Sequence, residues 1–137
     1  MPIKILIADD DEAVRKSHTF AVEAAAEVLK DDYIVVESGD SVDAWQKIKS
    51  QQFDLILVDN DFKDANLKGH LPGIALLQLA RKEGANKSTP IIFCSAEGFE
   101  GLKPMVERFN CVHLPKAGYD LEHATQLFVE EIKKSQK

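Results

Sequence analysis

Apolar residues along the chain form short continuous runs that alternate with longer stretches of helical spacing. The runs are rich in β-branched residues and predict strands over residues 3–8, 33–37, 53–58, 90–94 and 111–114. Between them, apolar residues recur every three or four positions, which predicts helices over residues 12–29, 42–48, 73–82, 97–109 and 121–132. In the last helix, which Asp120 can cap, the expected buried stripe comprises Leu121, Ala124, Leu127, Phe128 and Ile132.

The alternation of strands and helices predicts the class of fold. Strands that are apolar almost throughout belong to parallel sheets whose two faces are both covered by helices. No repeat, low-complexity tract or linker interrupts the pattern, so we expect one doubly wound α/β domain over residues 1–137. In such a sheet, ligands bind beyond the carboxyl ends of the strands.

The composition and charge of the chain exclude several classes of protein. The chain has 137 residues, of which 45% are hydrophobic, and this share argues against disorder. Its net charge of −6 disfavours direct binding to nucleic acid or to an anionic membrane. The start of the chain lacks the features of a signal peptide, and two cysteines, Cys94 and Cys111, form no disulfide framework. We therefore expect a cytoplasmic domain without a membrane span and without an effector domain in this chain, which is either a protein by itself or a part of a longer one.

Polar residues gather where the predicted strands end. Those that follow the first, third, fourth and fifth strands are Asp9, Asp10, Asp59, Asp61, Ser95 and Lys116. Each alone has an ordinary structural explanation, such as a helix cap or a turn. Together, the carboxylates would repel one another unless a cation neutralised them, and Mg²⁺ is suited to such oxygen ligands. A carboxylate beside Mg²⁺ can attack phosphorus while a lysine and a hydroxyl hold the phosphoryl oxygens, so the set predicts phosphoryl transfer to an aspartate.

Four segments in this order resemble the receiver domain of two-component response regulators. They are residues 5–12 (ILIADDDE), 53–59 (FDLILVD), 90–96 (PIIFCSA) and 114–116 (LPK). The resemblance extends over essentially the whole chain. It implies a five-stranded (βα)5 flavodoxin-like fold with strand order 2-1-3-4-5.

The resemblance also implies a metal site and a phosphoacceptor. Asp59 would accept the phosphoryl group and contact Mg²⁺. Asp10 would be the main side-chain metal ligand, and Asp9 would act mostly through metal-bound water. The backbone carbonyl of Asp61 would complete the protein's share of the site.

The remaining implied roles concern phosphoryl binding, switching and partners. Ser95 would hydrogen-bond the phosphoryl group, and Lys116 would pair with it. The switch would consist of Ser95 and the residue at position 113. The donor would be a sensor histidine kinase or a histidine phosphotransfer protein, and a downstream protein would bind the fourth helix, fifth strand and fifth helix. Such a domain is not an enzyme beyond catalysing its own phosphorylation and dephosphorylation.

The sequence departs from the family in three places. His113 occupies the position of the switch aromatic, where it is either a switch or a half-buried strand residue without that role. Ala117 follows Lys116 where the family usually has a proline, often after a cis bond. Residues 60–72 form a longer segment than usual, either a polar flap over the site or a tolerated insertion.

Two alternative functions remain open. A degenerate receiver would bind partners without phosphorylation, although all the site positions hold usable residues. Asp59 and Asp61 also match the Asp-x-Asp of haloacid-dehalogenase-like phosphatases. That family, however, carries this motif on its first strand and has a substrate cap, for which this chain leaves little room.

Overall fold

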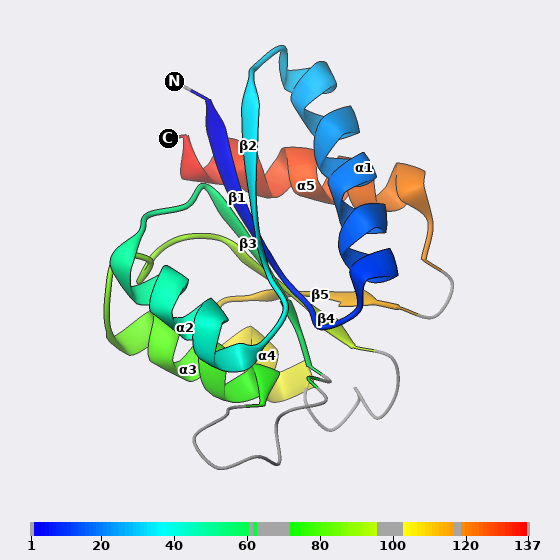
Figure 1. Cartoon of the computed structure of the whole chain (residues 1–137). Helices are drawn as coiled ribbons and strands as arrows, with labels where there is room; N and C mark the ends of the chain where they lie inside the picture. Colours follow the sequence, from blue (N-terminus) through cyan, green and yellow to red (C-terminus); the bar gives the residue numbers. More distant parts are fainter. Residues whose placement is uncertain (1, 61, 63–71, 96–102, 117–118, 137) are drawn as a thin grey trace.

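The computed structural model describes residues 2–60, 62, 72–95, 103–116 and 119–136. In this part of the chain, strands and helices alternate from one end to the other (Figure 1). They are β1 (Ile3–Ala8), α1 (Glu12–Leu29), β2 (Tyr33–Ser38), α2 (Ser41–Ser50), β3 (Leu55–Asp59), α3 (Gly73–Lys82), β4 (Ile91–Ser95), α4 (Lys103–Arg108), β5 (Val112–Pro115) and α5 (Leu121–Ser135). The strands form one parallel sheet in the order β2-β1-β3-β4-β5, which confirms the predicted flavodoxin-like α/β fold.

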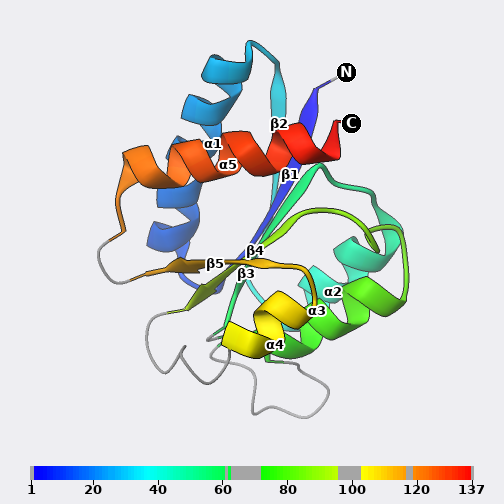
Figure 2. The same ribbon diagram turned by 180° about the vertical axis from the view of Figure 1, so that it is seen from behind.

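The helices lie in two layers, one on each face of the sheet. Figures 1 and 2 show α1 and α5 together on one face and α2, α3 and α4 on the other. This arrangement follows from right-handed connections between parallel strands, which change face where the strand order reverses. Among the described helices, none is both long enough and apolar enough to cross a membrane.

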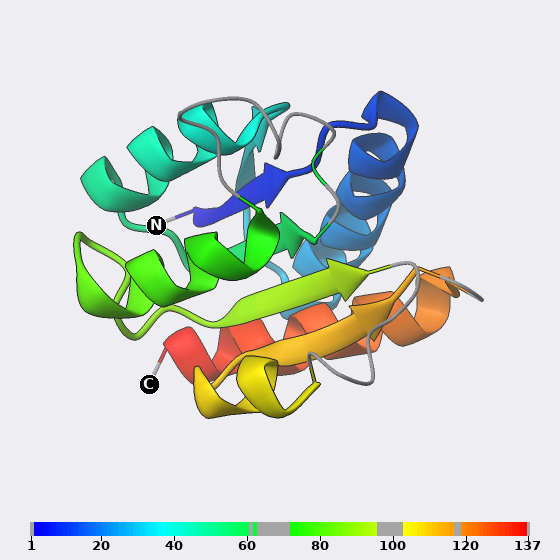
Figure 3. The same cartoon turned by 90° about the horizontal axis from the view of Figure 1, so that it is seen from below.

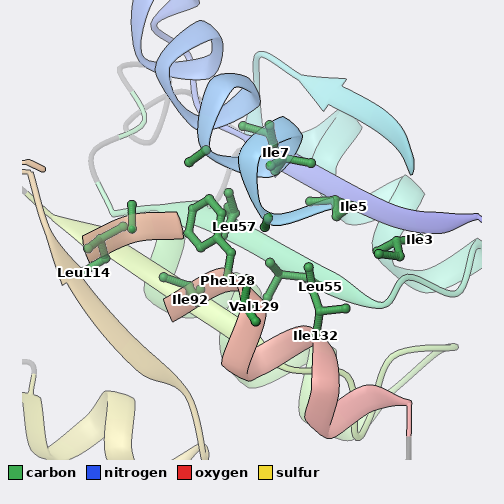
Figure 4. Close-up of a cluster of buried hydrophobic side chains, with 14 of the residues drawn as sticks. Ile3, Ile5, Ile7, Leu55, Leu57, Ile92, Leu114, Phe128, Val129 and Ile132 are labelled. Carbon is green, nitrogen blue, oxygen red and sulfur yellow. The ribbon is translucent and has the colours of Figure 1, made fainter. Parts of the chain in front are cut away.

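The core is divided by the alternation of side chains along each strand. Ile3, Ile5 and Ile7 point toward α1 and α5, where they meet Phe128 and Ile132 (Figure 4). Leu6 and Ala8 of β1 face the opposite layer and pack against α2 and α3. Because successive residues of a strand point to opposite faces, a strand is apolar wherever both faces are covered, and in β1 only the half-buried Lys4 near its start is polar. This requirement explains the continuous apolar runs in the sequence.

The structure shifts the ends of β3 by one or two residues from the prediction. Phe53 is buried but precedes the strand, because its amide donates to Oδ1 of Asn86 at 2.9 Å. The side-chain amide of Asn86 donates in turn to the carbonyls of Ile48 and Gln51, at 2.5 and 2.6 Å. At the other end, Asp59 belongs to the strand and pairs with β4. All strands point toward this edge of the sheet, seen most clearly for β1, β3, β4 and β5 in Figure 3.

Two predicted helices also differ in detail. Helix α4 begins at Lys103 in the described chain, and residues 97–102 of the prediction lie outside the described residues. It ends before Asn110, whose φ of 60° terminates the helix in the left-handed region. In α5 the cap at Asp120 is confirmed, but the predicted burial of Leu121 is wrong, because this first-turn residue is 48% exposed.

Candidate functional site

Three carboxylates meet at the carboxyl edge of the sheet. Asp9 and Asp10 follow β1, and Asp59 ends the neighbouring strand β3. One oxygen atom from each lies within 4.8 Å of the others. Asp9 and Asp59 are each only 1% exposed, and Asp10 is half-buried. The pairing of β1 with β3 therefore brings together residues that are about fifty positions apart in the sequence.

Lys116 brings a positive charge to this cluster from the far side of β4. Its amide donates to the carbonyl of Ser95 at 2.9 Å, which continues the β4–β5 pairing beyond the end of β5. Its ammonium lies 2.5 Å from Oδ1 of Asp59 and 3.4 Å from Oδ2 of Asp9. Burial lowers the pKa of Lys116, but the hydrogen bond and charge of Asp59 outweigh this effect, so the pKa is raised overall. Lys116 is therefore charged at any ordinary pH.

Asp9 is the carboxylate whose environment is least favourable to charge. Its Oδ1 accepts from the amide of Asp11 at 2.9 Å, whereas its buried Oδ2 makes no hydrogen bond to the described residues. Burial, and then the negative charge of Asp59, raise its pKa to about 6 against the lowering effects of the Asp11 amide and Lys116. This oxygen lies 3.4 Å from the Lys116 ammonium without a hydrogen bond, so it can still serve as a ligand for a divalent cation.

The three carboxylates fit a hard divalent cation. They supply oxygen ligands only, and two of them are buried, where their mutual repulsion is poorly screened by water. Among the described residues, no cysteine or histidine belongs to this group, so the donor set matches Mg²⁺ better than zinc.

Ser95 joins the site to the neighbouring strand β5. It is the last residue of β4 and is 1% exposed. Its Oγ lies 3.1 Å from Nε2 of the half-buried His113, which is registered opposite Phe93, two residues before Ser95. The two predicted switch residues are therefore in direct contact, so a displacement of the serine hydroxyl must change the surroundings of His113.

The charge on Asp9 should destabilise the fold at neutral pH in the absence of a divalent cation. Its folded pKa of about 6 exceeds the usual 3.8, so the folded state binds the proton more tightly than the unfolded state does. Stability then falls as pH rises from about 4 to 6 and remains lowered above that window. We expect Asp9→Asn to raise the free energy of unfolding by about 1–3 kcal/mol at pH 7.5 in EDTA.

Denaturant unfolding of both proteins at pH 5 and pH 7.5 measures this effect. The stabilisation by Asp9→Asn should be smaller at pH 5, where part of the wild-type carboxyl is protonated. The exposed Asp31 provides the control, because Asp31→Asn changes the same atoms without burial. A stabilisation independent of pH would contradict the explanation by charge.

Some predicted site features lie outside the described residues. These are the backbone carbonyl of Asp61, the Lys116–Ala117 bond and most of the 60–72 segment. Within that segment, Phe62 is described and is buried in the core on the α2 and α3 side of the sheet. This contact anchors the chain three residues beyond Asp59.

Two further residues, Arg15 and Gly73, shape the site although they belong to none of the sequence motifs described above. Arg15 donates from Nη1 to the carbonyl of Asp9 at 2.7 Å and from Nε to Glu37 at 3.1 Å, so it holds the end of β1 beside β2. Gly73, the first residue of α3, lies against the backbone of Asp59. A glycine directly after a proline at a helix start was the available signal for Gly73, whereas Arg15 looks like an ordinary surface residue of a helix.

Comparison with known proteins finds relatives in sequence and in fold. The sequence model of the response regulator receiver domain matches residues 5–108. A CheY-like receiver domain protein from Methanospirillum hungatei has a TM-score of 0.80 at 19% identity, covering 99% of this chain and 98% of that one. Chemotaxis protein CheY4 of Vibrio cholerae has a TM-score of 0.74 at 20% identity, covering 96% and 99% of the two chains. No curated protein gives a significant sequence match.

Proposed function

The chain belongs to the response regulator receiver domain family, and we propose that Asp59 accepts a phosphoryl group from a phosphohistidine donor in a reaction that requires Mg²⁺. The donor would be a sensor histidine kinase or a histidine phosphotransfer protein. The observation that carries the proposal is the meeting of three carboxylates with the Lys116 ammonium at the carboxyl edge of the sheet.

The arrangement of side chains supports Asp59 as the acceptor. One of its oxygens would form a bond to phosphorus as the phosphorus–nitrogen bond of the donor breaks, and the imidazole would leave with the electron pair of that bond. The contact with Lys116 balances the negative charge of Asp59 and places a positive charge where the phosphoryl oxygens would lie. On β4, Asp59 is paired with Cys94, and Ser95 is the next residue. The Ser95 hydroxyl therefore lies at the same edge of the sheet as Asp59, where it could donate to the phosphoryl group.

Asp9, Asp10 and Asp59 would hold the Mg²⁺ ion. When bound, the ion would neutralise carboxylate charge and draw negative charge from the transferred phosphoryl oxygens. Two observations support this assignment: Asp10 is half-buried, and Oδ2 of Asp9 makes no hydrogen bond to the described residues.

The output of the domain would be a change in protein contacts. Ser95 would turn toward the phosphoryl group, which alters its hydrogen bond to His113 and hence the surface of β5. We propose that a partner protein binds the surface formed by α4, β5 and α5. In this proposal the chain catalyses only its own phosphorylation and dephosphorylation.

Phosphorylation by a small donor tests the proposal. The protein is incubated with phosphoramidate or acetyl phosphate, and its intact mass is measured in Mg²⁺ and in excess EDTA. We expect one phosphoryl group per chain with Mg²⁺ and none in EDTA. Asp10→Asn should weaken Mg²⁺ binding at least about tenfold, since even residues that only support metal ligands contribute that much.

The outcomes distinguish the alternatives. A folded protein that takes up no phosphoryl group from either donor would favour a binding module that works without phosphorylation. Repeated hydrolysis of small phosphomonoesters would favour a phosphatase instead.

A further inference from the structure

The residue after Lys116 does not restrict the backbone of the chain in the way that a proline would. The residue that follows in the sequence is Ala117, so no proline ring restricts the backbone there. Lys116 also has a long, flexible side chain, which requires packing to hold its ammonium in one place. The described chain resumes at Tyr119, whose amide donates to the carbonyl of Lys116 at 3.2 Å. Whatever holds Tyr119 therefore also restrains Lys116.

Tyr119 rests on a buried histidine of α1. Its hydroxyl lies 3.4 Å from Nδ1 of His18, and the two rings meet edge to face with centroids 5.5 Å apart. His18 is 2% exposed and fixed from behind, with Nε2 3.7 Å from Sγ of Cys94 on β4 and its ring 6.3 Å from that of Phe128. Tyr119 thus packs against a histidine that is itself buried in the core.

His18 and Tyr119 also line a cavity next to Lys116. A small cavity of about 140 Å³ is lined by Val14, Ser17, His18, Lys116 and Tyr119. Lys116 therefore shares a pocket with the histidine–tyrosine pair, while its ammonium contacts Asp59.

The pair is uncharged under ordinary conditions. Burial, followed by the charge of Lys116, lowers the pKa of His18 to about 4. Burial raises the pKa of Tyr119 to about 12 and also raises that of Cys94. A neutral pair can act on Lys116 through packing and hydrogen bonding without competing with Asp59 for the ammonium.

We propose that Tyr119, held by the buried His18, is a positioning residue that aims the Lys116 ammonium at Asp59. Loss of the ring frees the segment that carries Lys116 and lets the ammonium leave the carboxylate. The consequence for phosphoryl transfer rests on the proposed function, whereas the effect on the Lys116–Asp59 contact does not.

The test measures the position of the ammonium and the rate of phosphorylation in the full chain. The ¹⁵N and ¹H shifts of the Lys116 ammonium are recorded in the wild type, in Tyr119→Ala and in Asp59→Asn, which lacks the carboxylate. We expect Tyr119→Ala to move the signal toward its position in Asp59→Asn. The phosphorylation rate should fall about 10- to 100-fold, a loss that misplacing a reacting group by about 1 Å can cause, with unchanged Mg²⁺ affinity.

Leu29→Ala is the matched control, because Leu29 packs against the same hydrophobic cluster from the opposite end of α1. It should lower stability while leaving the Lys116 signal and the phosphorylation rate unchanged. Tyr119→Leu, which retains apolar volume, replaces the alanine variant if that variant does not fold.

The two readouts separate two kinds of failure. An unchanged Lys116 signal in a folded Tyr119 variant overturns the positioning role, whatever the rate of phosphorylation. A wild-type protein that forms no phosphoryl adduct refutes the proposed function, and the ammonium signal then still decides whether Tyr119 positions Lys116.

Discussion

Asp59→Asn is expected to abolish the phosphoryl adduct completely while leaving the protein folded. The substitution keeps the size and shape of the side chain but replaces the attacking carboxylate by a neutral amide. It also removes one negative charge from beside the buried Asp9, so the folded state should tolerate it. Intact-mass measurement after incubation with phosphoramidate and Mg²⁺ reads the result directly.

The residue just before β3 supplies a matched control. Asp54 precedes β3 at the opposite edge of the sheet, where its Oδ2 accepts from the amide of Lys4 at 2.9 Å. Asp54→Asn should therefore form the adduct at the wild-type rate. An adduct of undiminished amount in Asp59→Asn would remove Asp59 from the role of acceptor, and peptide mapping would then locate the true one.

Gly73→Ala is expected to be the most destabilising small substitution near the site. An ideal Cβ at this position would lie 2.1 Å from the carbonyl oxygen of Asp59 and 2.8 Å from Cα of Asn60. Both are backbone atoms, so no side chain can move aside to make room. We expect a loss of at least about 3 kcal/mol in the free energy of unfolding, at the upper end for overpacking of a core.

The same substitution should also impair the chemistry. The backbone that must yield carries Asp59, so any folded fraction of Gly73→Ala should be phosphorylated far more slowly than the wild type. Denaturant unfolding and the rate per folded molecule are both needed to see this effect. Wild-type stability in Gly73→Ala would show that α3 can move away from β3 without cost.

Two other glycines provide the controls for Gly73. At Gly39 a new Cβ would meet only Nη1 of Arg15 at 3.5 Å, so Gly39→Ala should change stability by no more than about 0.5 kcal/mol. Gly84 has a φ of +86°, and its new Cβ would lie 2.7 Å from Cα of Lys49. Gly84→Ala should therefore destabilise the fold without lowering the phosphorylation rate of the folded molecules.

The local features of the sequence predicted the secondary structure and the edge of the sheet that carries the site. Apolar runs mark the strands because a doubly covered parallel strand is buried on both faces. Acids directly after the first and third runs place Asp9, Asp10 and Asp59 at one edge, whatever the exact ends of the strands. The errors occur where a non-local partner decides the outcome. Asn86 binds the amide of Phe53 and so delays the start of β3, and the first turn of α5 leaves Leu121 at the surface.

Contacts between distant segments were beyond the reach of sequence patterns. Lys116 and Asp59 are 57 positions apart in the sequence, and His18 and Tyr119 are 101 positions apart. No local sequence pattern could therefore predict that either pair is in contact. The close approach of Gly73 to the Asp59 backbone likewise depends on how α3 packs against β3.

The residue types and their order thus specify the class of fold and the chemistry available at the strand ends, because burial and side-chain chemistry are properties of each position. Three features arise only when β1, β3, β4 and β5 pair and α1 packs over them: the distance between the ammonium and the carboxylate, the lack of a hydrogen bond at Oδ2 of Asp9, and the support of Lys116 by Tyr119. Packing decides these features because it brings together atoms from segments that the chain itself keeps apart.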